Sequence, residues 1–304
     1  MNFPRAAAPR ISRFGGAMRS LFPILTVVAA IIGVWYLAAI WMNATWVYDQ
    51  AARDGREVGF SEVVGQTLNQ ERPVLPAPHQ VAKGLWDGVA GQKVTSKRSL
   101  VYHGWVTLSA TLLGFAFGSA AGILLAVGIV YNRAMDMSVM PWAIASQTIP
   151  ILAIAPMIIV VLNSLGVTGI VPKAIISAYL SFFPVVVGMV KGLRSPDAMQ
   201  LDLMRTYNAN GAQTFGKLRL PSSMPYLFAS LKVGVAASLV GTIVGELPTG
   251  AVAGLGSRLL SGSYYGQTVQ IWAALFAAAI LAASLVGIIG WVERVVLARM
   301  GLVR

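Results

Sequence analysis

The chain has 304 residues, of which 56% are hydrophobic and 11% are charged, whereas about a quarter of the residues of a soluble domain are charged. It contains no cysteine and two histidines, which excludes a disulfide framework, a thiolate metal site and a cysteine nucleophile and disfavours a histidine-built metal site. The formal net charge of +12 comes from scattered basic residues and not from a basic stripe with interleaved aromatic residues, so no nucleic-acid partner is expected.

Six apolar segments are long enough to cross a hydrocarbon core of about 30 Å, which needs roughly 20 helical residues. Because backbone amides in lipid need internal partners, we predict an all-α polytopic membrane protein with six transmembrane helices. The first apolar run is too long for the hydrophobic region of a secretory signal, so we expect this helix to be retained. The predicted spans are 21–42, 105–131, 139–162, 171–191, 226–247 and 269–292.

The distribution of basic residues predicts how these spans are oriented. If both termini are cytoplasmic, the inward-facing segments hold thirteen Lys and Arg residues, whereas the short outward-facing segments hold only Lys173 and Arg258. This bias indicates cytoplasmic termini. The expected domains are then a cytoplasmic N-terminal segment 1–20, a first transmembrane helix 21–42, an extracytoplasmic loop 43–104 and a core transmembrane domain 105–304.

The long outer loop contains three prolines between Pro73 and Pro78, which forbid a continuous helix and favour an extended strap. The strap is either a plain linker to the next span or a docking element, and the sequence leaves both open. Residues 81–89 are expected to form a short interfacial helix.

Small and charged residues within the spans carry further predictions. Gly114, Gly118 and Gly122 recur every four residues, so they share one helix face and should let another backbone approach closely. Glu246 lies near the outer end of the fifth span, where an uncompensated carboxylate costs at least a few kcal/mol. It is either a structural carboxylate bonded to its neighbours or a residue on a translocation pathway. Lys232 can extend toward the cytoplasmic surface and is assigned no role.

Prolines are expected to break two of the spans. Pro150 and Pro156 lie in the third span and Pro184 in the fourth, and proline removes a backbone donor and bends a helix. Kinked helices suit a translocation pathway, although they also occur in inert bundles. We place Gln147, Pro150 and Pro156 on such a pathway.

The segment 192–225 is too polar to span the membrane and too long for a simple turn. It divides into two amphipathic parts. In the first part Met199, Leu203 and Tyr207 fall on one helix face, and in the second Phe215 lies one turn before Leu218. Pro221 is expected to end the second helix. Two short helices around a break suit a lever for another protein, and the alternative is a solvated loop with two incidental turns.

In this segment the sequence resembles the permeases of binding-protein-dependent ABC importers. Their cytoplasmic loop has Glu-Ala-Ala, three residues, Gly, nine residues, an aliphatic residue, one further residue and Leu-Pro. Counting back from Pro221 places Leu218 in the aliphatic position, Asn208 in the glycine position and residues 202–204 in the Glu-Ala-Ala position. Asn tolerates the left-handed conformation nearly as well as glycine, so a corner can survive there.

Further motifs resemble the nitrate, sulfonate, taurine and pyrimidine-precursor branch of this family, within roughly residues 73–300. They are Leu75-Pro-Ala-Pro78, Thr107-Leu108, Gly114-Phe115, residues 149–156, Pro172-Lys173, Phe182-Phe-Pro184 and Gly254-Leu-Gly256. The resemblance implies a type I importer permease in a bacterial inner membrane. It also implies a second permease chain, giving a homodimer, an ATPase dimer that holds the ATP and magnesium, and an extracytoplasmic solute-binding protein.

The resemblance also implies which residues couple this chain to the ATPase. They are Asp202, Arg205, Tyr207, Asn208, Ala209, Gly211, Ala212, Phe215, Leu218 and Pro221. Residues 211–217 match part of a phosphate loop, but the next residue is Leu218 instead of Ser or Thr and no buried strand precedes the match. We therefore expect no nucleotide, metal or other cofactor on this chain, and no catalytic residues.

Two other functions are weighed against an importer subunit. An ion-gradient-driven transporter or channel would need several charged residues at the membrane midplane, and an intramembrane enzyme would need paired polar catalytic residues on facing spans. Neither pattern is evident. The substrate stays open between oxyanions and planar heterocycles, and the scarcity of cationic side chains in the spans disfavours a dedicated anion site.

Overall fold

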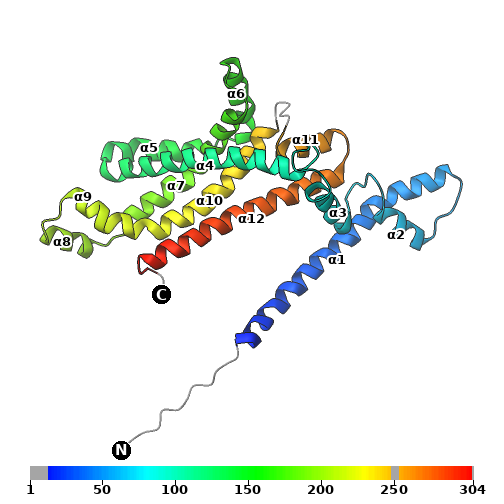
Figure 1. The fold of residues 1–304 in the computed structure, drawn as a ribbon, viewed down its shortest axis with the longest axis horizontal. Coiled ribbons are helices and arrows are strands. Elements are labelled where there is room, and N and C mark those ends of the chain that lie inside the picture. Colours follow the sequence, from blue (N-terminus) through cyan, green and yellow to red (C-terminus); the bar gives the residue numbers. More distant parts are fainter. Residues whose placement is uncertain (1–12, 248–252, 303–304) are drawn as a thin grey trace, which may run out of the picture. The chain divides into compact units, whose positions relative to one another are not determined.

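The computed structural model describes residues 13–247 and 253–302, and the chain divides into two compact units between Lys83 and Gly84 (Figure 1). Regular structure in these residues is helical throughout, which agrees with the predicted fold class. The first unit contains α1 (Arg13–Arg53) and α2 (Phe60–Leu68), and α3 (Pro78–Val89) crosses the boundary between the units.

The first unit is built on α1, which has 41 residues and runs eleven residues beyond the predicted membrane end at Met42. The expectation of a loop from residue 43 is therefore wrong for residues 43–53. These residues contain neither glycine nor proline, so nothing stops the helix there. Val47 and Ala51 on this extension are buried, as is Val63 of α2, which packs against α1.

The extended strap is fastened to α1 by the side chains of Asn43 and Trp35, and Trp35 Nε1 donates to the Pro76 carbonyl at 3.0 Å. The Asn43 side-chain nitrogen donates to the Leu75 carbonyl at 2.9 Å, and its oxygen accepts from the Val74 amide at 2.8 Å. Asn43 is fully buried. A buried amide that satisfies strap backbone on both sides makes the strap a docked element and not a free linker.

The second unit contains the remaining spans. Four helices here are long and apolar enough to cross a membrane, and α1 is a fifth among the described residues. The helices α5 and α6 meet at 98° around a break at 147–150 and give a sixth span if the bent pair is counted as one. The elements are α4 (Leu100–Tyr131), α5 (Arg133–Ser146), α6 (Ile151–Ser164), α7 (Ile170–Leu193), α8 (Ala198–Thr206), α9 (Gly211–Thr214), the π-helical turn η1 (Phe215–Arg219), α10 (Leu220–Glu246), α11 (Leu255–Tyr264) and α12 (Thr268–Arg299).

Only one of the three prolines interrupts its span. Pro150 lies at the break and precedes the first residue of α6, whereas Pro156 lies inside α6 and Pro184 inside α7. The predicted breaks at Pro156 and Pro184 are wrong. Both helices run through their prolines, because neighbouring helices and local adjustments satisfy the freed backbone groups in membrane spans.

Helices α4, α7 and α10 form the centre of the unit, and α4 contacts α7 through its glycine face. A β-carbon on Gly114 would lie 2.4 Å from the Ser177 side chain, and one on Gly118 would lie 2.2 Å from the Ser181 oxygen. Gly122 faces the Phe182 carbonyl in the same way. The glycines therefore bring the two backbones together, as expected for small residues between membrane helices.

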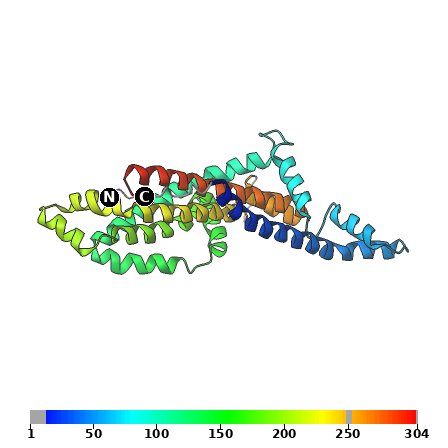
Figure 2. The ribbon, with the colours of Figure 1, turned by 90° about the horizontal axis from the view of Figure 1, so that it is seen from below.

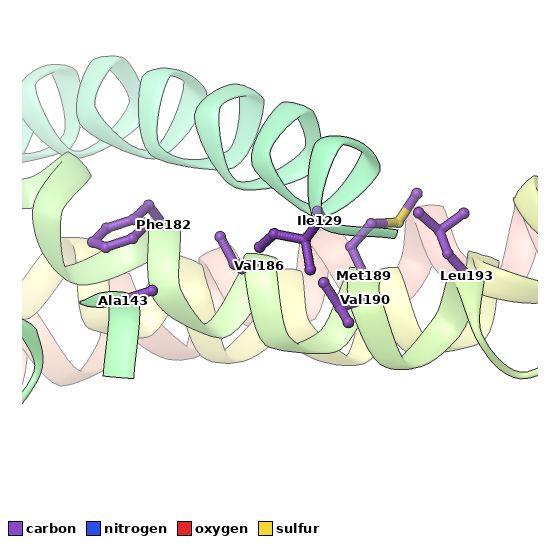
Figure 3. Packing of buried hydrophobic residues seen from close by; sticks show 8 residues of the cluster. Ile129, Ala143, Phe182, Val186, Met189, Val190 and Leu193 are labelled. Carbon is purple, nitrogen blue, oxygen red and sulfur yellow. The ribbon is translucent and has the colours of Figure 1, made fainter. Parts of the chain in front are cut away.

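An apolar cluster lies beside this contact, toward the end of the unit that carries α8. Ile129 of α4 and Ala143 of α5 meet Val186 and Met189 of α7 there (Figure 3). Within this unit α8 and α9 lie at the same end as the last turn of α12, and α11 lies at the opposite end (Figures 1 and 2). We refer to these as the α8 end and the α11 end.

Candidate functional sites

Helix α8 is a short, exposed helix with a well-defined start. Asp197 accepts from the Gln200 amide at 2.7 Å, and the Gln200 side chain accepts from the Asp197 amide at 3.2 Å, which is a capping box. Such a cap stabilises an isolated helix by about 1 kcal/mol. The helix carries an apolar stripe of Met199, Leu203 and Tyr207 along one face.

That stripe is not covered by this chain. Met199 is 81% exposed and Tyr207 is 76% exposed. Asp202 and Arg205 form an ion pair at 3.0 Å beside the stripe, and both are exposed, so the pair contributes little to stability. An apolar face that projects from the α8 end in this way is typical of a surface that another protein covers.

The corner after α8 is formed by Asn208, which has a φ of 50°. The Asn208 amide donates to the Arg205 carbonyl at 2.8 Å, and the Ala209 amide donates to the Met204 carbonyl at 3.0 Å. These two bonds are those of a Schellman motif with a left-handed residue after the helix. Gly211 begins α9 and is not among the residues with positive φ, so the corner lies at Asn208.

The chain after the corner is helical without interruption from Gly211 to Glu246, a run of 36 residues. A second capping box, formed by Asn210 and Gln213, starts it. The prediction that Pro221 ends this helix is wrong. Pro221 is the second residue of α10, and the Leu220 amide donates five residues back to the Phe215 carbonyl. The π-helical turn lets the chain pass from α9 into α10 without a break. Pro221 has no backbone amide, so its place at the start of α10 leaves no donor unsatisfied.

The base of this segment is held by the membrane helices. Arg219 donates to the Leu193 carbonyl at the end of α7 at 3.0 Å and lies over the Tyr131 ring of α4. Phe215 also packs against Tyr131, with ring centroids 6.0 Å apart, and against the apolar cluster of α4, α5 and α7. Phe215 is half-buried and supports the segment from within, and its predicted contact with the ATPase stays a prediction.

The other predicted coupling residues are of two kinds, those exposed on the surface of the segment and those half-buried within it. Ala212 and Gly211 are exposed, whereas Ala209, Leu218 and Pro221 are half-buried. The exposed surface of the segment is therefore made by the α8 stripe, the corner at Asn208 and the start of α9.

A second concentration of polar groups lies at the α11 end, around the fully buried Glu246. The Thr107 hydroxyl lies 3.0 Å from both carboxylate oxygens, and the Gly256 amide donates to one of them at 2.8 Å. Lys173 of α7 lies 3.6 Å from the carboxylate. Thr107 in turn accepts from the Leu255 amide at 2.8 Å. We call these five residues the Glu246 cluster.

The cluster explains why glycines begin α11. Gly254 has a φ of 132°, and a β-carbon there would lie 2.1 Å from the Glu246 carboxyl carbon. A β-carbon on Gly256 would lie 2.5 Å from the Ile243 carbonyl. The Gly254 amide donates to Nδ1 of the buried His103 at 2.9 Å, so the proton of the neutral ring is on Nε2, which faces the Lys97 carbonyl. The start of α11 and the buried Glu246 carboxylate satisfy each other, because the free backbone amides of a helix start favour a negative charge.

Comparison with known proteins identifies the family. Residues 118–301 match the family described as binding-protein-dependent transport system inner membrane component. The chain belongs to this family. It is 31% identical over 220 residues to the formylaminopyrimidine transport permease protein ThiX of Halalkalibacterium halodurans, covering 72% of this chain and 80% of that one.

Other permeases give similar matches. The riboflavin transport system permease protein RibX of Chloroflexus aurantiacus is 29% identical, covering 73% of this chain and 78% of its own. The putative aliphatic sulfonates transport permease protein SsuC of Bacillus subtilis is 22% identical, covering 74% and 77%. The chain is thus the membrane-spanning permease component of an ABC importer for a small solute, and the resemblance seen in its motifs is confirmed.

Of the residues assigned to a permease pathway, three lie at or just after the break between α5 and α6, and the fourth, Glu246, ends α10. Gln147 is half-buried at the break between α5 and α6, Pro150 is exposed at the same break, and Pro156 is half-buried inside α6. Glu246 is enclosed by the cluster. In this conformation the geometry of Glu246 is that of the structural carboxylate, the first of the two alternatives left open by the sequence.

Sequence reasoning missed an ion pair within the membrane helices. Lys232 of α10 pairs with Glu293 of α12, so Lys232 does not simply extend to the surface. It also missed Thr107, Lys173 and His103 as partners of one site. The available signal was that Thr107, Lys173 and Gly254–Gly256 all belonged to family-like motifs, but nothing in the linear pattern placed those motifs together.

The α11 end of the permease also contains a half-buried arginine. The Nε atom of Arg258 is buried and has no hydrogen-bond partner within the described residues. Burial lowers the pKa of the Arg258 guanidinium, and the neighbouring Arg98 lowers it further. An arginine stays charged at neutral pH even so, and this end of the permease therefore carries several cations close together.

Proposed function

We propose that this permease moves its solute inward by alternating access, driven by an ATPase dimer that docks on the exposed surface of α8, the Asn208 corner and the start of α9. A second copy of the chain completes the pathway, and an extracytoplasmic binding protein delivers the solute. The observation that carries the proposal is the uncovered apolar stripe of α8, a projecting helix with a capped start. This helix contains the residues that align with the start of the cytoplasmic-loop motif of the importer permeases.

The continuous helix from Gly211 to Glu246 supports a mechanical role. At about 1.5 Å per residue it reaches roughly 54 Å, from the proposed ATPase contact to the Glu246 cluster. Near its N-terminal end, Arg219 of this helix is hydrogen-bonded to the last residue of α7. A displacement of the α8 corner would therefore be passed to α7 and α10 together, as a shift of rigid packed elements.

Orientation and substrate complete the proposal. Both termini are cytoplasmic, because the basic residues concentrate at the α8 end and in the terminal segments. The solute is a small molecule of the classes named for the relatives, namely a pyrimidine derivative, a flavin or a sulfonate. ATP is bound and hydrolysed by the partner.

The test is co-purification with the ATPase encoded beside this permease. A tagged permease should retain the ATPase, and replacing Met199, Leu203 and Tyr207 together with serine should weaken retention at least tenfold, because buried apolar anchors carry most of the binding free energy. The matched control is Met300→Ser, which removes another exposed methionine at the α8 end. Failure of the unmodified chain to retain the ATPase, or full retention by the triple variant, would refute the proposal.

A further inference from the structure

A cavity of about 470 Å³ opens at the α11 end between α4, α6 and α7. This volume falls in the range of small-molecule sites. Apolar residues form much of its wall, and the polar side chains that line it are Tyr102, Ser109, Asn163, Thr168 and Lys173. The wall also includes Gly245 of α10 and Ala253, so the cavity adjoins the Glu246 cluster without containing Glu246 itself.

Lys173 is the one charged side chain among these lining residues. Its Nζ atom donates to the Ala253 carbonyl at 3.1 Å and lies 3.6 Å from Glu246. An ammonium group has three donors, and these two contacts leave one for the cavity. The side chain is 14% exposed, so its charge acts through a poorly solvated environment in which electrostatic attraction is stronger than in water.

Glu246 pairs with Lys173 but does not itself line the cavity. The carboxylate is fully buried behind Lys173 and accepts from the Thr107 hydroxyl and the Gly256 amide. The carboxylate thus has partners on α4, α7 and α11, and the Lys173 ammonium group is the charged group that lines the cavity. Asn163 and Thr168 add an amide and a hydroxyl that can donate to the same guest.

We propose that this cavity receives the anionic group of the transported solute, a carboxylate or sulfonate on a small organic molecule, with Lys173 as the counter-charge. The inference rests on the proposed transport function and names the solute class for it. It also revises the expectation that a dedicated anion site is disfavoured, because Lys173 was counted with the outward-facing segments and not with a cavity.

The absence of cysteine allows a direct test in the full chain, reconstituted in nanodiscs without the ATPase. Ile170 lines the cavity and is exposed, so Ile170→Cys provides a reporter thiol. Its modification rate is measured with an anionic methanethiosulfonate reagent, the sulfonatoethyl compound, and with a cationic one, the trimethylammonioethyl compound. Tyr264→Cys, which is exposed on α11 and does not line the cavity, is the matched control.

The ratio of the anionic to the cationic rate should be about tenfold higher at Ile170→Cys than at Tyr264→Cys, because a cleft of one sign concentrates counter-ions by that order. Ethanesulfonate should slow modification of Ile170→Cys at constant ionic strength, and propane-1,2-diol should not. Adding Lys173→Gln together with Glu246→Gln, which removes both charges, should abolish the preference, whereas Lys173→Arg should keep it.

Equal rate ratios at the two thiols, or a preference that persists in the double glutamine variant, would overturn the anion site. If the neutral variants do not assemble, protection by ethanesulfonate in the Ile170→Cys chain alone decides the question, and its absence counts against the site. Because no ATPase is present, a negative result here is distinct from a failure of the proposed coupling, which is judged by ATPase retention.

Discussion

At the scale of single residues, Thr107 connects most of the Glu246 cluster. Its hydroxyl donates to the carboxylate and accepts from the Leu255 amide, so one atom satisfies two buried groups from different elements. Leaving a buried polar group unsatisfied costs about 1–3 kcal/mol. The start of α11 therefore depends on a residue that looks, in the sequence, like an ordinary polar residue in a membrane span.

We expect Thr107→Val to destabilise the permease by about 1–3 kcal/mol, because valine matches threonine in shape but offers neither the donor nor the acceptor. Thermal unfolding of the purified chain in detergent should show a lower midpoint. Thr107→Ser keeps the hydroxyl and should recover most of the loss. Equal midpoints for the valine variant and the unmodified chain would mean that the hydroxyl does not stabilise the cluster.

At the scale of elements, the contact between α4 and α7 leaves no room for larger side chains. A β-carbon on Gly118 would lie 2.2 Å from the Ser181 oxygen and 2.7 Å from the Ala178 carbonyl. The Ala178 contact is with backbone, so the helices themselves must separate. Gly104 lies on the same helix with nothing from this chain within 4 Å, and it supplies a control with the same chemical change.

Gly118→Ala should reduce the yield of folded permease and lower its stability by about 1–3 kcal/mol, the usual cost of overpacking. Gly104→Ala should have little effect. Size-exclusion chromatography and thermal unfolding of the two variants provide the comparison. The packing account fails if the two substitutions are indistinguishable.

The elements also show where sequence reasoning succeeds and where it stops. Hydropathy located the five long spans of the described residues because lipid imposes long apolar runs, and the glycine spacing indicated a packing face. The extension of α1 to Arg53 and the passage of the helix through Pro221 were missed. The first was open to prediction, because residues 43–53 contain neither glycine nor proline. The second depends on the π-helical turn beside Tyr131, which local propensity does not record.

The two candidate sites differ in whether their geometry is local in the sequence or depends on long-range contacts. The corner at Asn208 could be placed by counting residues within one motif, because its geometry is local. The Glu246 cluster could not, since its partners come from α4, α7, α10 and α11. A contact between residues more than a hundred positions apart has no periodicity that a single sequence displays.

At the scale of the whole molecule, the proposed orientation is the property on which both sites depend. A reporter fused after Gln70 should give an extracytoplasmic signal, and one fused after Ser195 should give a cytoplasmic signal, because the inward-facing segments carry the basic excess. Alkaline phosphatase and green fluorescent protein fusions measure the two sides separately. The reverse pattern would place the α8 surface outside and remove any access to an ATPase.

The central claim is that the α8 corner transmits the work of the ATPase to the membrane helices, and Asn208 offers the most direct measurement. Its positive φ costs a β-branched residue about 1–2 kcal/mol or more, whereas glycine adopts it freely. The quantity to measure is solute-stimulated ATP hydrolysis by the reconstituted complex of permease, ATPase and binding protein. We predict that Asn208→Val reduces the solute-stimulated rate of ATP hydrolysis about tenfold or more, and that Asn208→Gly retains it. Full stimulation in the valine variant, with normal insertion, would contradict the account.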